Sequence, residues 1–412
     1  MFEHIPVYPG DPILSLFQDF QRDPEARKVN LSIGLYYDEA GKVPVLPSVR
    51  GAASRLAEQG TAHTYLPMEG SAGYCQALQQ LIFGADSAAL RERRIATLQT
   101  VGGSGAIRLG ADLLKRYFPD SAIWVSDPSW DNQGVLFSAA GLEVHTYPYY
   151  DPLTNGIRFD EMIATLSGLA AGSIVLLQPC CHNPTGIDPS REQWLAITEL
   201  CAKRGLIPFL DMAYQGFGDE LADDAWPIRA MTDAGLSLFV SNSFSKNFSL
   251  YGERCGGLSV VCPNQNEAAR VFGQAQANVR RMYSSPPLYG SQLISTVLND
   301  AVLATQWVAD VAAMRERIKR MRAALKTRLD TLVPGMSFDY LVTQRGMFSY
   351  TGLAPNEVGA LRERRGVYLL RSGRACMAGL NDANVDYVAD SIGEVLKARV
   401  NRYQPTRRIS NA

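Results

Sequence analysis

The sequence predicts an α/β protein, with a large domain built on a mostly parallel seven-stranded sheet and a smaller α+β domain. Short apolar runs alternate with helical patterns through the middle of the chain. Runs such as 174–177 are apolar at successive positions, as in strands that are buried on both faces. The length of 412 residues is sufficient for two domains.

The expected elements follow in order along the chain. Strands of the large sheet are expected at 95–101, 122–126, 144–147, 174–178, 207–211, 238–241 and 257–262. Helices are expected at 106–117 and 191–203, and one helical pattern without Pro or Gly runs from about 292 to 328. Short strands at 338–342, 347–350, 367–370 and 375–379 alternate with helices, which indicates the smaller domain.

The charge balance and the cysteines exclude several kinds of partner. Lys+Arg 40 nearly cancels Asp+Glu 41, so the chain has no basic field for nucleic acid or an anionic membrane. Seven Cys without a CxxC pair indicate a reducing compartment, and the four His are too scattered for a metal site. The N-terminus lacks a signal-peptide pattern, and no apolar run is long enough to span a bilayer. We expect a cytoplasmic protein with no metal.

Lys246 lies in the segment 241–254, Ser-Asn-Ser-Phe-Ser-Lys-Asn-Phe-Ser-Leu-Tyr-Gly-Glu-Arg, directly after a predicted strand. A Lys among small hydroxyl and aromatic side chains loses its charge readily and can form a Schiff base. The alternative is a surface Lys in a polar loop. This segment alone favours that alternative.

A glycine-rich segment, Gly102-Gly103-Ser104-Gly105, joins a predicted strand to a predicted helix. Free backbone N–H groups, the helix dipole and the Ser104 hydroxyl favour a phosphate there. The segment fails as a dinucleotide fingerprint, because Arg108 stands where the third glycine belongs. A purely structural turn is the alternative.

Two more polar segments follow predicted strands. Cys-His-Asn-Pro-Thr-Gly at 181–186 comes after strand 174–178, while Asp211 and Tyr214 come at and after the end of strand 207–211. Ligands of open α/β sheets bind at the carboxyl ends of the strands. An Asp there is more often a cap or a turn residue. An Asp, a Tyr, an Asn, a Lys and a phosphate cradle at successive strand ends nevertheless form a set.

Seven motifs, in order, resemble those of the class I aminotransferases of fold type I, which bind pyridoxal 5'-phosphate. The motifs are 30–39, 65–70, the cradle at Gly102, Cys-Cys-His-Asn-Pro-Thr-Gly at 180–186, 246–254, 280–287 and Ser-Gly-Arg at 372–374. The similarity extends over nearly the whole chain. The nearest branch is the bacterial aromatic-amino-acid (tyrosine) aminotransferases, which are relatives of aspartate aminotransferase.

The resemblance implies roles for the residues around the cofactor. Lys246 would carry it as a Schiff base and move the proton at the substrate Cα, while Asp211 would pair with the pyridinium nitrogen. Asn183 and Tyr214 would hydrogen-bond the ring O3′. The other implied cofactor residues are Trp130 on the ring face, Gly103, Ser104, Ser243 and Arg254 around the phosphate, and Tyr65 of the neighbouring subunit.

The resemblance also implies how amino acids and 2-oxo acids are bound. Arg374 would bind the α-carboxylate and Arg280 of the other subunit a distal carboxylate, while Gly34, Trp130 and Asn183 would complete the substrate site. Leu35, Tyr37, Val43, Ser104 and Ser285 match the aromatic branch, whereas Thr64 departs from it. We therefore expect transamination of aromatic and acidic L-amino acids, with 2-oxoglutarate as amino acceptor.

A homodimer with shared active sites follows from the same resemblance. Residues 1–10, with Pro6 and Pro9, would form an arm that crosses to the partner. Residues 11–43 and 315–412 would form the small domain, and residues 44–314 the large cofactor-binding domain. Pro12 is also expected to lie outside regular structure.

Two residues depart from the family pattern. Gln133 and Gln178 stand where relatives carry His close to the cofactor Asp, and an amide can still donate a hydrogen bond to Asp211. One alternative is therefore a diverged homologue that uses the same Schiff base for epimerisation or hydrogen exchange at Cα. A remote alternative is an NAD-dependent dehydrogenase, which the misplaced glycine and the setting of Lys246 oppose.

Overall fold

The computed structural model describes residues 1–60 and 62–403, which form two compact units. One unit is the continuous segment Pro44–Glu316. The other combines Met1–Val43 with the chain from Arg317 onward. The second boundary lies two residues beyond the expected 314/315. It falls inside a long helix, so the sequence pattern does not mark a domain boundary there.

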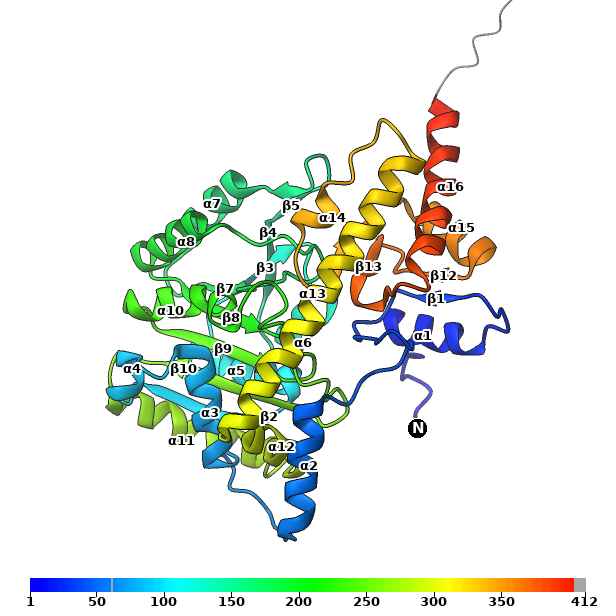
Figure 1. The fold of residues 1–412 in the computed structure, drawn as a ribbon. Coiled ribbons are helices and arrows are strands. Elements are labelled where there is room, and N and C mark those ends of the chain that lie inside the picture. Colours follow the sequence, from blue (N-terminus) through cyan, green and yellow to red (C-terminus); the bar gives the residue numbers. More distant parts are fainter. Residues whose placement is uncertain (61, 404–412) are drawn as a thin grey trace, which may run out of the picture. The chain divides into compact units, whose positions relative to one another are not determined.

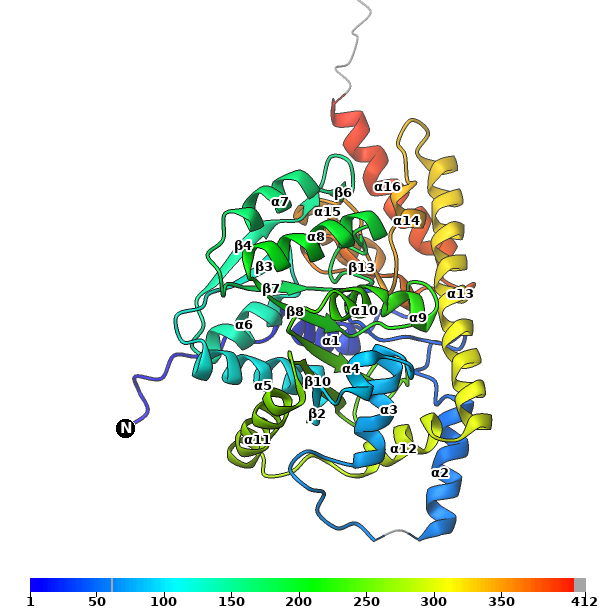
Figure 2. The same cartoon turned by 90° about the vertical axis from the view of Figure 1, so that its left-hand side faces the viewer.

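The larger unit contains a seven-stranded sheet in the order β2-β10-β9-β8-β7-β3-β4, seen edge-on in Figure 2. Its strands are β2 (Ile95–Val101), β3 (Ile123–Asp127), β4 (Val144–Pro148), β7 (Ile174–Leu177), β8 (Ile207–Met212), β9 (Leu238–Ser243) and β10 (Cys255–Val261). All neighbours are parallel except β10, which is antiparallel to both β2 and β9. The seven predicted strands and the mostly parallel sheet are confirmed.

Helices cover both faces of this sheet (Figure 2). On one face lie α5 (Gly102–Tyr117), α6 (Asp131–Ala139) and α11 (Gln265–Met282). On the other lie α3 (Ala72–Phe83), α7 (Phe159–Ser167), α8 (Arg191–Arg204) and α10 (Trp226–Asp233). Shorter or outer elements of the unit are α2 (Pro47–Gln59), α4 (Ala88–Arg91), α9 (Leu221–Asp224) and the hairpin of β5 (Tyr150–Asp151) with β6 (Gly156–Ile157).

Aromatic packing anchors the sheet under α5 and α6. Phe209 of β8 stacks on Phe239 of β9 with centroids 5.7 Å apart, and Phe137 of α6 meets Phe209 edge-on. A Cβ on Gly110 of α5 would lie 2.6 Å from the Phe209 ring, so the glycine lets the helix approach the sheet closely. This layer fixes the strands whose ends carry the polar residues described below.

The smaller unit is built from short pairings between distant parts of the sequence. Strand β1 (Val29–Asn30) pairs in parallel with β12 (Val367–Tyr368), and β11 (Phe348–Tyr350) pairs antiparallel with β13 (Arg374–Cys376). Its helices are α1 (Pro12–Arg22), α14 (Tyr340–Thr343), α15 (Pro355–Arg365), α16 (Val385–Tyr403) and the short η1 (Met377–Gly379). The predicted α+β character is confirmed.

Three expectations for the smaller unit were wrong in whole or in part. Residues 340–342 of the expected strand 338–342 belong instead to the helix α14, in which Leu341 is buried and Val342 is exposed. The expected strand 375–379 is a strand at residues 375 and 376, the end of β13, and continues as the 3₁₀ turn η1 from Met377. Pro12 is the first residue of α1, where a missing N–H costs nothing, and the Asp11 side chain accepts from the N–H groups of the first turn.

The helical pattern expected from about 292 to 328 is two helices, α12 (Tyr289–Leu298) and α13 (Ala301–Leu332). Asp300 begins the second helix, because its Oδ1 accepts from the N–H groups of Val302 and Leu303 at 3.1 and 2.9 Å. Figure 1 shows α13 in yellow. Within residues 1–60 and 62–403, no helix has both the length and the apolar character that crossing a membrane requires.

Candidate active site

The polar residues gather at the edge of the sheet where the parallel strands end. Asp211 of β8 lies opposite Ser241 of β9, and Ser243 ends β9 two residues later. Because β10 runs antiparallel, it begins at this same edge, and the carbonyl of Arg254 just before it accepts from the N–H of Gly102 at 2.8 Å. The sheet topology therefore brings four separate motifs together.

Asp211 is a buried carboxylate held by two neutral donors. Ser241 Oγ donates to its Oδ1 at 2.7 Å, and Gln133 Nε2 donates to its Oδ2 at 2.6 Å. Burial raises the pKa of Asp211, and the two hydrogen bonds and the charge of Lys246 oppose that rise. An ionised carboxylate has about four lone-pair positions, so these two bonds leave room for a further donor.

Gln133 is fully buried in the first turns of α6 and is itself oriented by its neighbours. Ser129 Oγ donates to its Oε1 at 2.6 Å, and its main-chain N–H donates to the carbonyl of Trp130 at 2.8 Å. The amide therefore has its acceptor occupied and its donor directed at Asp211. Trp130 is half-buried at the N-cap of α6 and packs against the core under the sheet.

A hydrogen bond from Gln178 to Asp211 was expected, but the Gln178 amide bonds the main chain of Asn183 instead. Its Oε1 accepts from the main-chain N–H of Asn183 at 2.8 Å, and its Nε2 donates to the main-chain carbonyl of Asn183 at 3.0 Å. The expectation was wrong because the loop after β7 folds back over the strand end and offers the amide a nearer pair of partners.

Asn183, Tyr214 and Lys246 form a connected group. Asn183 Nδ2 donates to Tyr214 Oη at 3.3 Å, and Lys246 Nζ lies 5.2 Å from the centre of the Tyr214 ring. Asn183 and Tyr214 are both buried. The charge of Lys246 also opposes the rise in the pKa of Asp211 that burial causes, so this group and the carboxylate share one electrostatic environment.

The turn that carries Lys246 is fixed by aromatic packing beneath it. Phe244 and Phe248 meet edge-on with centroids 5.3 Å apart, and Phe248 stacks on Trp307 at 4.6 Å. Trp307 Nε1 also donates to the carbonyl of Asn247 at 2.9 Å. The aromatic residues flanking Lys246 in the sequence are thus structural supports for its turn.

A cradle rich in donors lies beside this turn. Gly102 has φ +66°, and a Cβ on Gly103 would lie 3.0 Å from the Cβ of Ser243, so side chains at both glycines would fill it. The first turn of α5 has no acidic residue and no side-chain cap, so its N–H groups after that of Gly102 can serve another acceptor. Arg254 Nη1 contacts Ser245 Oγ at 3.2 Å and the carbonyl of Tyr251 at 3.1 Å. The cradle suits an anion.

Tyr65 and Arg280 line a surface hollow of about 610 Å³ together with 66–69, Ser284 and Ser285. The Tyr65 side chain is 96% exposed. Arg280 is also exposed, and its guanidinium donates to the Ser284 hydroxyl.

Gly34 and Arg374 belong to the smaller unit and meet at one aromatic ring. Arg374 is buried, donates through Nη2 to the carbonyl of Ser32 at 2.8 Å, and lies over the Phe348 ring at 4.3 Å. A Cβ on Gly34 would lie 2.8 Å from Phe348, so this position has room for glycine only. The expected substrate residues Gly34 and Arg374 are therefore neighbours.

Comparison with known proteins decides the family. Residues 26–392 match the model of aminotransferase class I and II. The chain is 56% identical over 397 residues to the aromatic-amino-acid aminotransferase of Escherichia coli (strain K12), covering 96% of this chain and 100% of the relative. The chain belongs to this aminotransferase family.

Two further relatives bear on the site. The aspartate aminotransferase of Pseudomonas aeruginosa is 43% identical over 396 residues, covering 96% of this chain and 100% of the relative. The aromatic-amino-acid aminotransferase of Burkholderia pseudomallei, solved covalently bound to pyridoxal phosphate, superposes with a TM-score of 0.94 at 45% identity over 96% of this chain and 99% of that one. The expected family and the fold type I architecture are confirmed for this aminotransferase.

Sequence reasoning missed several residues that support the aminotransferase site. Ser241 orients Asp211 and lies within the segment 241–254, while Ser129 orients Gln133 and directly precedes Trp130. Asp188 accepts from the main-chain N–H groups of Cys181 and His182 and so shapes the turn before Asn183. An Asp shortly after an irregular Asn-Pro-Thr-Gly turn is the signal that could have identified it.

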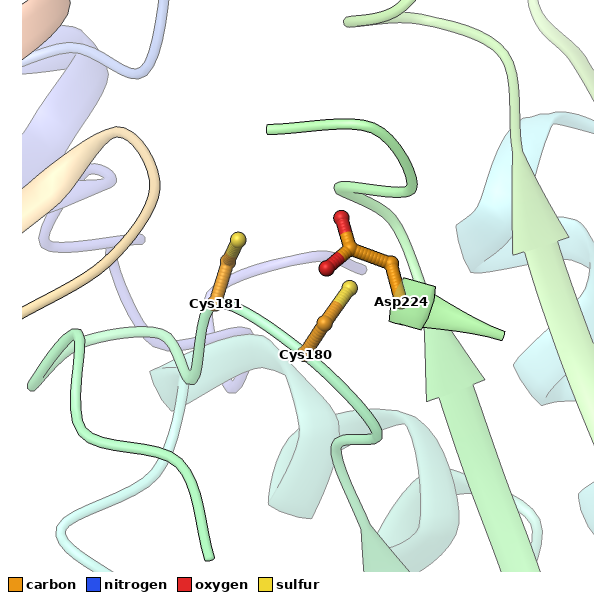
Figure 3. A group of neighbouring side chains, drawn as sticks. All are labelled: Cys180, Cys181 and Asp224. Atoms are coloured by element: carbon orange, nitrogen blue, oxygen red, sulfur yellow. The ribbon is translucent and has the colours of Figure 1, made fainter. Parts of the chain in front are cut away.

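A cluster of Cys180, Cys181 and Asp224 lies behind the same loop (Figure 3), with their ligand atoms within 4.8 Å of one another. The Asp224 carboxylate already accepts from the N–H groups of Gly216, Gly218 and Asp219 at 2.7 to 3.1 Å. Burial raises the pKa of the Cys180 thiol well above its usual range, and only a thiolate binds a metal. We interpret the cluster as packing that supports the loop after Tyr214.

Proposed function

We propose that this aminotransferase transfers the amino group of aromatic and acidic L-amino acids to 2-oxoglutarate, with pyridoxal 5'-phosphate as cofactor. The observation that carries the proposal is the group of Lys246, Asp211, Asn183 and Tyr214 beside the anion cradle. The similarity to an aromatic-amino-acid and to an aspartate aminotransferase supports both substrate classes.

The residues of the site fit both the phosphate end and the ring end of this cofactor. The N–H groups at the start of α5, with the hydroxyls of Ser104 and Ser243 and the Arg254 guanidinium, would hold the phosphate. Asp211 would hold the ring nitrogen in its protonated form, because its carboxylate retains unused lone pairs. Asn183 and Tyr214 would bind the ring oxygen O3′, and Trp130 would lie against the ring face.

The chemistry divides between cofactor and chain. When bound, pyridoxal phosphate supplies the electron sink that makes a proton at the substrate Cα removable. Lys246 would attach the cofactor and, once displaced from it, take that proton from Cα as a general base. Asp211 would keep the proton on the ring nitrogen, and the burial of Asp211, Asn183 and Tyr214 would limit competing water.

Substrate selection rests on the two arginines and their surroundings. Arg374 would bind the α-carboxylate common to all substrates, with Gly34 beside it leaving space. Arg280 would bind the distal carboxylate of aspartate, glutamate or 2-oxoglutarate. Leu35, Tyr37, Val43 and Ser285 would provide the lining that also admits aromatic side chains.

A homodimer in the cytoplasm completes the proposal. The exposure of Tyr65 and Arg280 at one surface hollow supports a site that is shared between subunits. Met1, Phe2, Ile5, Val7 and Tyr8 of the proposed arm are 57% to 97% exposed, which suits a segment that packs on a partner. The proposed domains are 1–10, then 11–43 with 315–412, and 44–314.

The test is a panel of amino donors assayed with 2-oxoglutarate as acceptor on the cofactor-loaded protein. We expect turnover with phenylalanine, tyrosine, aspartate and glutamate as donors. The absence of amino transfer, together with exchange of the Cα hydrogen or loss of Cα chirality, would favour epimerisation or hydrogen exchange instead. A protein without a visible cofactor band that oxidised substrates with NAD would overturn the proposal.

A further inference from the structure

The side chain of Gln178 forms a closed ring with the main chain of a single residue. Gln178 directly follows β7 and is 7% exposed. Its amide accepts from the N–H of Asn183 at 2.8 Å and donates to the carbonyl of Asn183 at 3.0 Å. Both polar groups of that main chain are therefore tied to the end of a central strand.

The loop around Asn183 has no regular secondary structure to fix it. Cys181 has φ +52°, and Pro184 has no N–H to donate. Asp188 holds the N–H groups of Cys181 and His182, and the N–H of Gly186 bonds the carbonyl of His182 at 2.7 Å. These contacts hold the residues on either side, whereas the Gln178 amide holds Asn183 itself.

We propose that Gln178 is a positioning residue that directs the Asn183 side chain by clamping its main chain with two hydrogen bonds. The proposal rests on the proposed function, in which Asn183 donates to the cofactor ring oxygen. The donated bond draws electron density from that oxygen and so lowers the pKa of the neighbouring nitrogen that joins the cofactor to Lys246. A loosened Asn183 would donate less well, and that pKa would rise.

An amide is suited to this position because its donor and acceptor lie side by side on one planar group. Methionine has a similar length and volume but makes neither bond. Histidine carries its two nitrogens at different points of a ring and can make at most one of the two bonds in this arrangement. We therefore expect Gln178→Met to disturb the position of Asn183 more than Gln178→His does.

The test measures the visible absorption of the bound cofactor against pH in the holoenzyme, without turnover. We expect Gln178→Met to raise the pH midpoint of the absorbance change by about half a unit or more, in the same direction as Asn183→Ala. Gln178→His should shift it less and provides a second variant if the methionine variant folds poorly. In the double variant Gln178→Met with Asn183→Ala, the Gln178 change should add no further shift.

Gln79→Met is the matched control. Gln79 lies on α3, and its Nε2 donates to the Thr97 hydroxyl at 3.0 Å and the carbonyl of Ile95 at 3.3 Å, away from the cofactor residues. This control should leave the midpoint unchanged even if it lowers stability. An unshifted midpoint in Gln178→Met, or an equal shift with and without Asn183, would overturn the positioning role. A wild-type protein with no visible band after addition of pyridoxal phosphate would refute the proposed function instead.

Discussion

Gln133 Nε2 donates to Asp211 Oδ2 at 2.6 Å, so a neutral amide stands where an imidazole is expected beside the cofactor carboxylate. The bond orients Asp211 but adds no charge that titrates near neutral pH. The second glutamine, Gln178, acts on Asn183 instead. The two glutamines, at positions where the family resemblance implies His, therefore make different contacts although they share one residue type.

The first prediction concerns the replaced histidines. Because Asp211 can meet the ring nitrogen directly, Gln133→His, Gln178→His and the double change should alter single-turnover transamination by no more than about tenfold, or about 1.4 kcal/mol. Asp211→Ala removes the counter-ion of the ring nitrogen and should cost far more. The rates are measured from the loss of cofactor absorbance on mixing with an amino acid. Near-native rates in Asp211→Ala would require another mechanism.

The second prediction concerns Lys246. Reduction of the holoenzyme with borohydride should attach the cofactor to Lys246, because its Nζ lies 5.2 Å from the Tyr214 ring and its turn follows Ser243, which lies close to Gly103 of the cradle. Peptide mapping identifies the labelled residue. Lys246→Ala should still bind pyridoxal phosphate through the cradle but lose proton transfer at Cα. A label on any other lysine would show that the assignment is wrong.

The third prediction separates the two arginines. Arg374→Ala should weaken every amino acid substrate, since all carry an α-carboxylate. Arg280→Ala should chiefly weaken aspartate, glutamate and 2-oxoglutarate, by about 2 to 5 kcal/mol for the lost charge-assisted pair. Half-reactions with phenylalanine and aspartate are compared through kcat/KM. Equal losses for both substrates in Arg280→Ala would contradict the proposed role of that arginine.

The fourth prediction follows from a buried imidazole. His182 bonds Ser126 Oγ at 2.9 Å and Thr185 Oγ1 at 2.8 Å and stacks on Tyr149, and burial lowers its pKa to about 3. The unfolded chain, with a His pKa near 6.5, binds the proton below that value while the folded chain does not. This contribution to stability is present above about pH 6.5 and is lost progressively on acidification toward pH 3.

Between pH 7 and pH 5 the loss should be about 2 kcal/mol. Urea unfolding of the holoenzyme is measured at both pH values, for the wild type and for His182→Gln, which removes the titrating group. The variant should show a smaller decrease in the free energy of unfolding than the wild type. Equal decreases would mean that His182 does not remain neutral in the folded protein.

Local apolar pattern was sufficient to predict all seven strands of the large sheet. Strands buried on both faces, such as Ile174–Leu177, carry their signal in consecutive residues. The candidate cofactor residues were also accessible from sequence, because they follow those strands and lie in ordered motifs. The shape of the cradle at Gly102 and Gly103 agrees with the phosphate that the glycine-rich turn suggested.

Elements with a weaker sequence signal, such as the break between α12 and α13, depend on contacts that the local pattern does not reveal. The interruption between α12 and α13 depends on the Asp300 side chain capping the second helix, although no Pro or Gly marks it. The segment 338–342 is short and apolar, and its residues 340–342 are helical, with Leu341 buried and Val342 exposed. A short apolar run is compatible with both the helical and the strand periodicity, so its structure is decided by the residues that it packs against.

The sequence by itself determined the family, the parallel sheet and the candidate chemistry, because each depends on short contiguous segments, either apolar runs or motifs. Only the tertiary structure decided that Val29 pairs with Val367, that Gln133 reaches Asp211, and that Gln178 holds Asn183. A side-chain amide bonds whichever polar group the folded loops bring within about 3 Å. That choice depends on how the loop after β7 turns back over its strand, which no stretch of neighbouring residues specifies.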